Sequence, residues 1–438
     1  MLNKVNQNDD FNVLVTRILI YLNRIKFWDK SSFEISFKKL SNICFNISLI
    51  TLSFFLILSI AVDIKNSHDL SSFAKLDPLC FHLIGFSKWI TGLFHLNEIK
   101  DLVLRMKRCH KLCLNYNESE MDYQHYNTKI IKFNNYMKKF TYLWLLICVG
   151  GMIQWCFNPI IQDFLLEFFC EKKINSSSSR TLPFPGAFPW IIDSTLRYIL
   201  TFTFQFFSSL STAFELAVFD VLNVILLANV CFNFQHLNEI LAKNHADIMI
   251  VRFSSSDKSH LKLKTKLKNC ILHHQEVLIF IAKLKDVFSY PMFIVCLDST
   301  IALCLVSFEA STIKINSSVE SITKLINMVQ YWIGIVTELF IYCFLATKIE
   351  DLGLKTADAI YVCNWEQSMV NYRDNFIGEH RDEILEINQM VKFSIMRAQK
   401  PIIINGGLFY VLSLQTFKAL VGLSLSNAIV LRQLVGET

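Results

Sequence analysis

Long runs of apolar residues alternate along this chain with polar, charged segments. A helix needs about 20 predominantly apolar residues to cross a bilayer, because its backbone polar groups must be satisfied internally in lipid. Seven runs meet or approach this length: 43–62, 76–96, 140–161, 198–234, 287–308, 326–346 and 402–434. The pattern therefore predicts an all-α membrane protein with seven transmembrane helices.

Three of the seven runs are irregular. The fourth would form a helix about 55 Å long and should project out of the bilayer. The second contains His82, Lys88 and His95, a polarity that a pore or a ligand cavity would explain. The seventh is interrupted by Gly406 and Gly407, which predict a break in that helix.

Lysine and arginine gather in alternate loops, and cytoplasmic loops carry the excess of these residues. The segment before the first run and the 2–3 and 4–5 loops are basic, whereas the 1–2 and 3–4 loops carry few basic residues. Two glycosylation sequons, at Asn175 and Asn316, fall in the 3–4 and 5–6 loops. We therefore expect a cytoplasmic N-terminus and an extracellular C-terminus.

Composition agrees with a membrane protein and excludes several other classes. Of 438 residues, 53% are hydrophobic and 18% charged, whereas soluble domains carry about 25% charge. The net charge of +6 is spread over loops, so we expect no nucleic-acid partner. No CxxC pair with zinc-ligand spacing and no catalytic constellation stands out, and we expect neither enzyme activity, nor a metal, nor a cofactor.

An inverted topology argues against a G-protein-coupled receptor, which has an outside N-terminus. The third run also ends at Asn158-Pro159 instead of the acidic-Arg-aromatic triplet of that class. A transporter remains an alternative, although transporters usually show internal repeats and helices broken in matched halves.

The C-terminal third, at residues 338–365 and 396–434, has a distinctive order of motifs. An Arg-x-Gln-x-Pro motif is followed by a glycine break, an aromatic, Ser-Leu-x-x-Phe and a Leu-Arg-Gln end. The residues of these motifs are Arg397, Gln399, Pro401, Gly406, Gly407, Phe409, Ser413, Leu414, Phe417, Leu431, Arg432 and Gln433. In this order the tail resembles that of insect odorant receptors. The stretch 183–190 (PFPGAFPW) matches more loosely. A gustatory receptor of the same superfamily is an alternative, but that branch prefers Thr-Tyr where this chain has Ser426-Asn427.

The resemblance implies a subunit of a tetrameric, odorant-gated, non-selective cation channel. Such a subunit assembles with the odorant receptor coreceptor in the plasma membrane of sensory-neuron dendrites. It further implies a cytoplasmic N-terminal helix (1–42) and helices one to six (43–350), with the long fourth helix entering a cytoplasmic anchor region. A cytoplasmic loop and the first part of helix seven (351–401) would follow, and then the pore-lining second part (402–438).

The last helix carries the predicted pore. Leu423, Asn427, Val430 and Leu434 follow at steps of four, three and four, which places them on one face. The family's gate positions match Val430 and Leu434, with Gln433 beside them, and a ring of such side chains can gate by dewetting. The alternative is that this stripe packs against the fifth and sixth helices of its own subunit.

By resemblance, a small, volatile, mostly apolar ligand binds within each subunit between helices two, three, four and six. Trp155 offers an aromatic wall with one hydrogen-bond donor, and Gly151 leaves room for a ligand. Plain packing is the competing interpretation for each position. The candidate residues are Phe81, Ile84, Cys148, Gly151, Trp155, Phe206, Leu210, Tyr331 and Ile335.

Three acidic residues, Glu215, Asp298 and Glu338, fall at membrane depth, where ionisable groups are costly. We expect each to be paired or hydrated rather than to conduct ions.

Overall fold

The computed structural model describes residues 37–67, 75–115, 120–170, 181–251, 257–312, 319–363, 365 and 381–436. The helices are α2 (Phe37–Asn66), α3 (Leu76–Phe94), α4 (Leu96–Asn115), α5 (Glu120–Leu145), the π-helix η3 (Leu146–Gly150), α6 (Gly151–Cys170), α7 (Thr195–Val251), α8 (Asp257–Thr312), α9 (Val319–Val362), α11 (Arg381–Ala398) and α12 (Leu414–Gly436). Two short strands, β1 (Asn405–Gly406) and β2 (Tyr410–Val411), form an antiparallel hairpin. Asn175, Asn316 and most of the predicted segment 1–42 lie outside the described residues.

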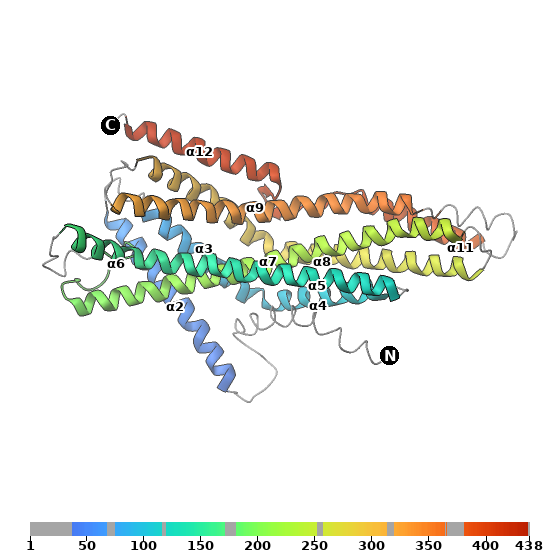
Figure 1. Cartoon of the computed structure of the whole chain (residues 1–438), viewed down its shortest axis with the longest axis horizontal. Coiled ribbons are helices and arrows are strands. Elements are labelled where there is room, and N and C mark those ends of the chain that lie inside the picture. Colours follow the sequence, from blue (N-terminus) through green and yellow to red (C-terminus); the bar gives the residue numbers. More distant parts are fainter. Residues whose placement is uncertain are drawn as a thin grey trace.

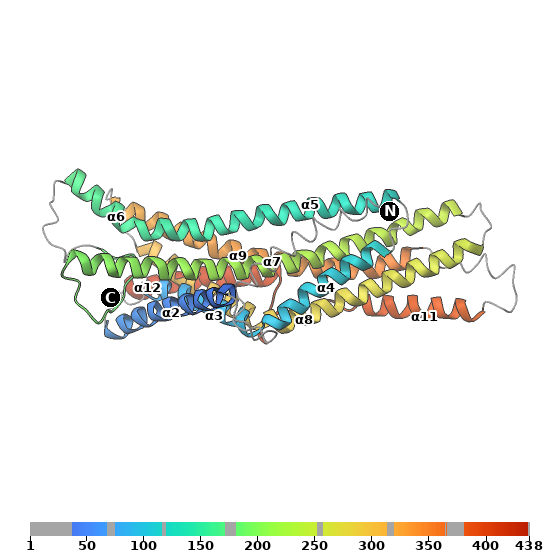
Figure 2. The same cartoon turned by 90° about the horizontal axis from the view of Figure 1, so that it is seen from below.

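Three very long helices, α7, α8 and α9, run along most of the elongated molecule (Figures 1 and 2). They contain 57, 56 and 44 residues. At one end they pack with α2, α3, α6 and α12, and at the other with α4, α5 and α11 (Figure 1). The apolar pattern predicted excess length only for the fourth run, because it detects the part of a helix that lipid requires and not its polar continuation.

Within the described ranges, six helices are long and apolar enough to span a membrane. A seventh candidate is the pair α3 and α4, which meet at a bend of 73° near His95. The second run, predicted as one crossing, is therefore one arm of a bent pair. The predicted all-α membrane fold with seven candidate spans is confirmed.

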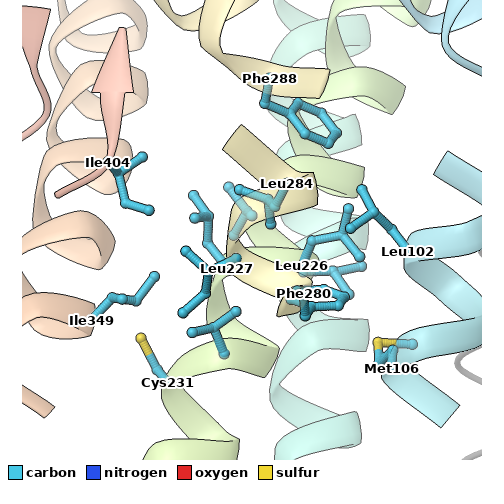
Figure 3. Close-up of a cluster of buried hydrophobic side chains, with 14 of the residues drawn as sticks. Leu102, Met106, Leu226, Leu227, Cys231, Phe280, Leu284, Phe288, Ile349 and Ile404 are labelled. Atoms are coloured by element: carbon cyan, nitrogen blue, oxygen red, sulfur yellow. The ribbon is translucent and has the colours of Figure 1, made fainter. Parts of the chain in front are cut away.

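The end of the molecule that contains α4 and α11 has a continuous hydrophobic core (Figure 3). Leu102 and Met106 of α4 lie on the side of Leu226 of α7 and Phe280 of α8, and Ile349 of α9 lies on the opposite side of the cluster, near Cys231 of α7 (Figure 3). The five side chains other than Cys231 are at most 3% exposed. This end of the molecule is therefore a well-packed base, since close-packed interiors deform little.

The seventh run departs from its prediction. A break at Gly406 and Gly407 was expected inside a helix starting near 402, but α12 begins only at Leu414 and the β1–β2 hairpin precedes it. Gly407 has φ +63°, and a Cβ there would lie 2.9 Å from the Cβ of Phe293. The Gly407 N–H donates to the Ser289 carbonyl (2.8 Å) of α8, close to Pro291, which interrupts the hydrogen-bond ladder of that helix. The break is therefore a docked turn rather than a kink.

Candidate functional site

Aromatic side chains from four parts of the chain form a closed circuit at the end of the molecule that contains α2, α3 and α6. Neighbouring ring centroids are 5.3 Å apart for Phe81 and His82, 5.2 Å for His82 and Phe184, and 6.5 Å for Phe184 and Trp155. Trp155 and Tyr331 are 6.5 Å apart, and Tyr331 returns to Phe81 at 6.2 Å. We call these five residues the aromatic circuit. Offset and edge-to-face contacts of this kind between rings are favourable.

The segment before α7 supplies Phe184, which is 4% exposed. The side-chain amide of Gln205 holds it in place: Nε2 donates to the Phe184 carbonyl (2.8 Å) and Oε1 accepts from the Phe184 N–H (3.2 Å). Ser59 of α2 makes two hydrogen bonds to Ala187 in the same segment. The Ser59 hydroxyl donates to the Ala187 carbonyl, and the Ser59 backbone carbonyl accepts from the Ala187 N–H. These bonds fix one side of the circuit.

The structure brings three of the nine predicted ligand residues, Phe81, Trp155 and Tyr331, into the aromatic circuit. Ile335 packs beside Tyr331 in a small cluster with Ala302 and Leu303. Ile84, 7% exposed, lies one turn after Phe81 on α3.

The other four predicted positions lie apart from the circuit or at its margin. Phe206 stacks on Phe202 and meets the edge of Phe157. Cys148 lies in the π-helix η3 and packs on the main core, and Leu210 is partly buried on α7. The space at Gly151 is taken by Gln330, whose Nε2 would lie 2.6 Å from a Cβ at that glycine. The π-helical turn η3 contains an extra residue compared with an α-helical turn. Cys148, which lies in η3, therefore does not share one continuous helix face with Gly151 and Trp155, as regular α-helical spacing would require.

A chain of buried polar groups leads away from the circuit. Nδ1 of His82 lies 3.0 Å from the Thr212 hydroxyl of α7. The Ser53 hydroxyl of α2 lies 3.4 Å from Thr212 Oγ1 and 3.4 Å from each carboxylate oxygen of Glu215. Glu215 is fully buried, so the expected pairing of this carboxylate takes the form of a hydroxyl contact.

A buried ion-pair cluster lies close to the circuit. Lys88 Nζ of α3 donates to Asp220 Oδ1 of α7 and to Glu338 Oε1 of α9, both at 2.6 Å. The Lys88 and Asp220 side chains are 1% exposed and that of Glu338 is 14% exposed. The Tyr342 hydroxyl also donates to Asp220 Oδ1 (2.7 Å). Glu338 is thus paired, as expected, whereas Asp298 lies partly buried on α8, within electrostatic range of Lys88 and Glu338.

The predicted pore helix α12 packs against its own subunit along a narrow stripe of Leu420, Ser424 and Ala428, each at most 5% exposed. Ser424 donates to the Thr300 carbonyl of α8 (3.1 Å). By contrast, Leu423 is 50% and Val430 52% exposed, and Asn427 and Gln433 are also exposed. The alternative, in which this stripe packs against the fifth and sixth helices of the same subunit, is therefore wrong for these positions. Leu434 belongs to α12, but its side chain lies outside the described set.

The start of α12 is tied to the bundle. Ser413 caps the helix by accepting a hydrogen bond from the Thr416 N–H (3.1 Å), and Thr347 of α9 accepts one from the Leu414 N–H (3.0 Å). The start of α12 is therefore fixed to α9, and outside the stripe of Leu420, Ser424 and Ala428 most of its described surface is not covered by this subunit.

Several residues of the site were missed by the residue pattern. His82 and Lys88 appeared only as polarity in the second run, which a pore or a ligand cavity would explain, and Asp220 did not stand out. Complementary charges in apolar runs two, four and six were the available signal. Phe184 lies in the stretch 183–190 that loosely matches the family, but nothing in that stretch indicated that its ring would join the site.

Comparison with known proteins identifies relatives along most of the chain. A family model described as 7tm Odorant receptor matches residues 73–425. Odorant receptor 13a of Drosophila melanogaster is 23% identical over 289 residues, which are 66% of this chain and 64% of that protein. The odorant receptor coreceptor of Harpegnathos saltator is 21% identical over 177 residues, 40% of this chain and 33% of that protein.

The fold also matches solved structures. The olfactory receptor OR5 of Machilis hrabei superimposes with a TM-score of 0.72 at 16% identity, covering 97% of this chain and 98% of that one. The same receptor in complex with eugenol superimposes with a TM-score of 0.71 at 16% identity, covering 96% and 97%. At this identity the likeness concerns the fold.

Proposed function

This chain belongs to the 7tm odorant receptor family, and we propose that it is the odorant-binding subunit of a ligand-gated, non-selective cation channel. In this proposal it assembles with the odorant receptor coreceptor as a tetramer in the dendritic plasma membrane of olfactory sensory neurons. The family match to residues 73–425 favours this reading over the gustatory alternative. Related coreceptors in the comparison support that assignment of partner.

One observation carries the channel proposal: α12 leaves Leu423, Asn427 and Val430 uncovered by its own subunit. Apolar side chains that face lipid need no further explanation, but an exposed asparagine among them does, because a polar amide in hydrocarbon is costly. A shared central pore would hydrate Asn427 and bring the Val430 side chains of four subunits together as a constriction. Leu434 and Gln433 would continue this lining toward the end of the helix.

The proposed topology and regions are those that the loop charges and the family resemblance lead us to expect. We take the N-terminus as cytoplasmic and the C-terminus as extracellular, with 1–42 in the cytoplasm and helices one to six between 43 and about 350. The segment 351–401 would complete the cytoplasmic anchor region, and 402–438 would form the pore-lining part of helix seven. The well-packed base around α4 and α11 supports an anchoring role.

The aromatic circuit supports an odorant site within each subunit. Its walls are apolar and come from α3, α6, α9 and the segment before α7, so a small apolar ligand would touch all of them. The related receptor whose structure contains eugenol is one precedent for a compact aromatic ligand.

The test is co-expression with a coreceptor in oocytes, with membrane current recorded while a broad odorant panel is applied. Odorant-evoked inward current carried by both Na⁺ and K⁺ supports the proposal. Robust surface expression with several coreceptors and no evoked current overturns it. Uptake of a substrate without channel current would indicate the transporter alternative.

Two matched pairs refine the test. Val430→Ser should alter resting current or ion selectivity, whereas Leu425→Ser, an exposed leucine on a different face of α12, should not. Trp155→Leu should raise the odorant concentration for half-maximal current about tenfold or more, because burial of the ligand against the Trp155 ring contributes roughly 1.5–3 kcal/mol to binding. Phe206→Leu, outside the circuit, should change it much less.

A further inference from the structure

His82 is the one member of the aromatic circuit whose ring carries two nitrogens, and only one of them is satisfied. The residue is fully buried, and Nδ1 lies 3.0 Å from Thr212 Oγ1. Nε2 has no hydrogen-bond partner and is closed to solvent. A buried polar atom without a partner costs roughly 1–3 kcal/mol, so its retention calls for an explanation.

The hydrogen bonds around Thr212 decide which nitrogen carries the proton. The Thr212 hydroxyl has one hydrogen and lies within reach of two acceptors, the Ser208 carbonyl one turn earlier (3.1 Å) and His82 Nδ1 (3.0 Å). We assign the hydrogen to the Ser208 carbonyl, because a threonine inside a helix commonly donates to the carbonyl four residues earlier. Thr212 Oγ1 is therefore the acceptor in its contact with His82, and Nδ1 is the donor. A charged imidazole enclosed by Phe81 and Phe184 would be costly, so the ring is neutral. In a neutral ring with Nδ1–H, the other nitrogen is a hydrogen-bond acceptor.

The acceptor nitrogen lies on the ring edge opposite Thr212. Nδ1 contacts Thr212 of α7, and the two nitrogens of an imidazole point in divergent directions, so Nε2 is directed away from Thr212. The imidazole is flanked by the rings of Phe81 and Phe184, both members of the aromatic circuit. Because Nε2 is closed to solvent, a ligand would reach it by displacing one of its neighbours.

We propose that the odorant recognised by this chain carries a hydrogen-bond donor, such as a hydroxyl or an amine N–H, that binds His82 Nε2. This inference rests on the proposed odorant site and narrows the class of its ligand. The apolar body would lie against the rings of Phe81, Trp155 and Tyr331. A ketone, ester or ether has only acceptors and would leave Nε2 unpartnered.

The experiment compares ligands that differ only in the donor. Oocytes expressing the chain with a coreceptor are tested with 4-ethylphenol against 4-ethylanisole, 2-phenylethanol against its methyl ether, and 1-hexanol against its methyl ether. We expect the donor member to activate at a concentration about tenfold lower, since a hydrogen bond to a buried acceptor is worth about 1–1.5 kcal/mol. Equal potency within the pairs, or preference for the ethers, overturns the inference.

Two variants test the role of His82 itself. His82→Phe keeps a ring but removes the acceptor, and it should bring the donor-to-ether potency ratio close to one. Thr212→Val is nearly isosteric and removes the acceptor for Nδ1–H; the ring can then carry its proton on Nε2, and the preference should weaken or reverse. The control is Thr201→Val. This variant removes another buried hydroxyl of α7, which accepts a hydrogen bond from Trp190 Nε1, and it should leave the donor-to-ether potency ratio unchanged.

The outcomes separate the two proposals. Currents with an unchanged donor preference in His82→Phe overturn the inference but leave the odorant-gated channel standing. A surface-expressed chain that gives no current with any odorant overturns the proposed function. Should His82→Phe fail to reach the surface, Thr212→Val decides: an unchanged ratio in that variant counts against the inference.

Discussion

Replacing Lys88 by methionine should destabilise this chain more than replacing any exposed lysine. Lys88 is the single cation between Asp220 and Glu338, with both bonds at 2.6 Å, and its side chain is 1% exposed. Methionine keeps the apolar stem but leaves two neighbouring carboxylates without their counter-ion. The cluster joins α3, α7 and α9, so its loss acts on three helices at once.

The magnitude follows from the burial of the pair. Removing one partner of a buried ion pair costs roughly 3–5 kcal/mol, which shifts the unfolding equilibrium by about two to four powers of ten. Asp220→Asn should cost less, because Lys88 keeps Glu338 and the Tyr342 hydroxyl can still donate to the new amide. Glu338→Gln should cost least, since this carboxylate is 14% exposed.

The assay is equilibrium unfolding in mixed micelles with a rising fraction of dodecyl sulfate, followed by circular dichroism. Lys75→Met is the control, because its bond to Asp63 joins side chains that are 23% and 25% exposed and should contribute under about 1 kcal/mol. Combining Lys88→Met with Asp220→Asn and Glu338→Gln should recover most of the stability by removing the unpaired charges. The reasoning is refuted if Lys88→Met unfolds at the same detergent fraction as Lys75→Met, or if the triple variant is no more stable than Lys88→Met.

Further predictions concern the hairpin and the loops. Gly407→Ala should destabilise the chain by about 1–2 kcal/mol, because Gly407 has φ +63° and a Cβ there would lie 2.9 Å from Phe293. Gly422→Ala should stabilise it by up to about 1 kcal/mol, because Gly422 lies inside α12 and a Cβ there would have no neighbour within 4 Å. Both are measured by the same unfolding assay, and equal effects would contradict the role of the turn. Asn175→Gln and Asn316→Gln should each remove one glycosidase-sensitive mass increment on gels of protein made in insect cells. No change in mass in either variant, or an increment that remains in the double variant, would contradict the proposed topology.

Part of the site followed from the family resemblance, which places the ligand between helices two, three, four and six. Phe81, Trp155 and Tyr331 were expected to share that site, and the structure does bring their rings together. Phe206 was expected with them and instead stacks on Phe202. Spacing assigns a side chain to a face of one helix, but the neighbour of that face depends on how the helices cross.

The helical character of the membrane-spanning runs was determined by the sequence alone. Apolar runs of about 20 residues in lipid can satisfy their backbone only as helices, so seven such runs dictate an all-α membrane bundle. Only the tertiary structure decided which polar groups meet. The partners of Lys88 lie 132 and 250 residues away, and His82 acquires an unpaired acceptor only because Thr212 faces it. Local pattern carries no information about such distant contacts, since they follow from how whole helices pack.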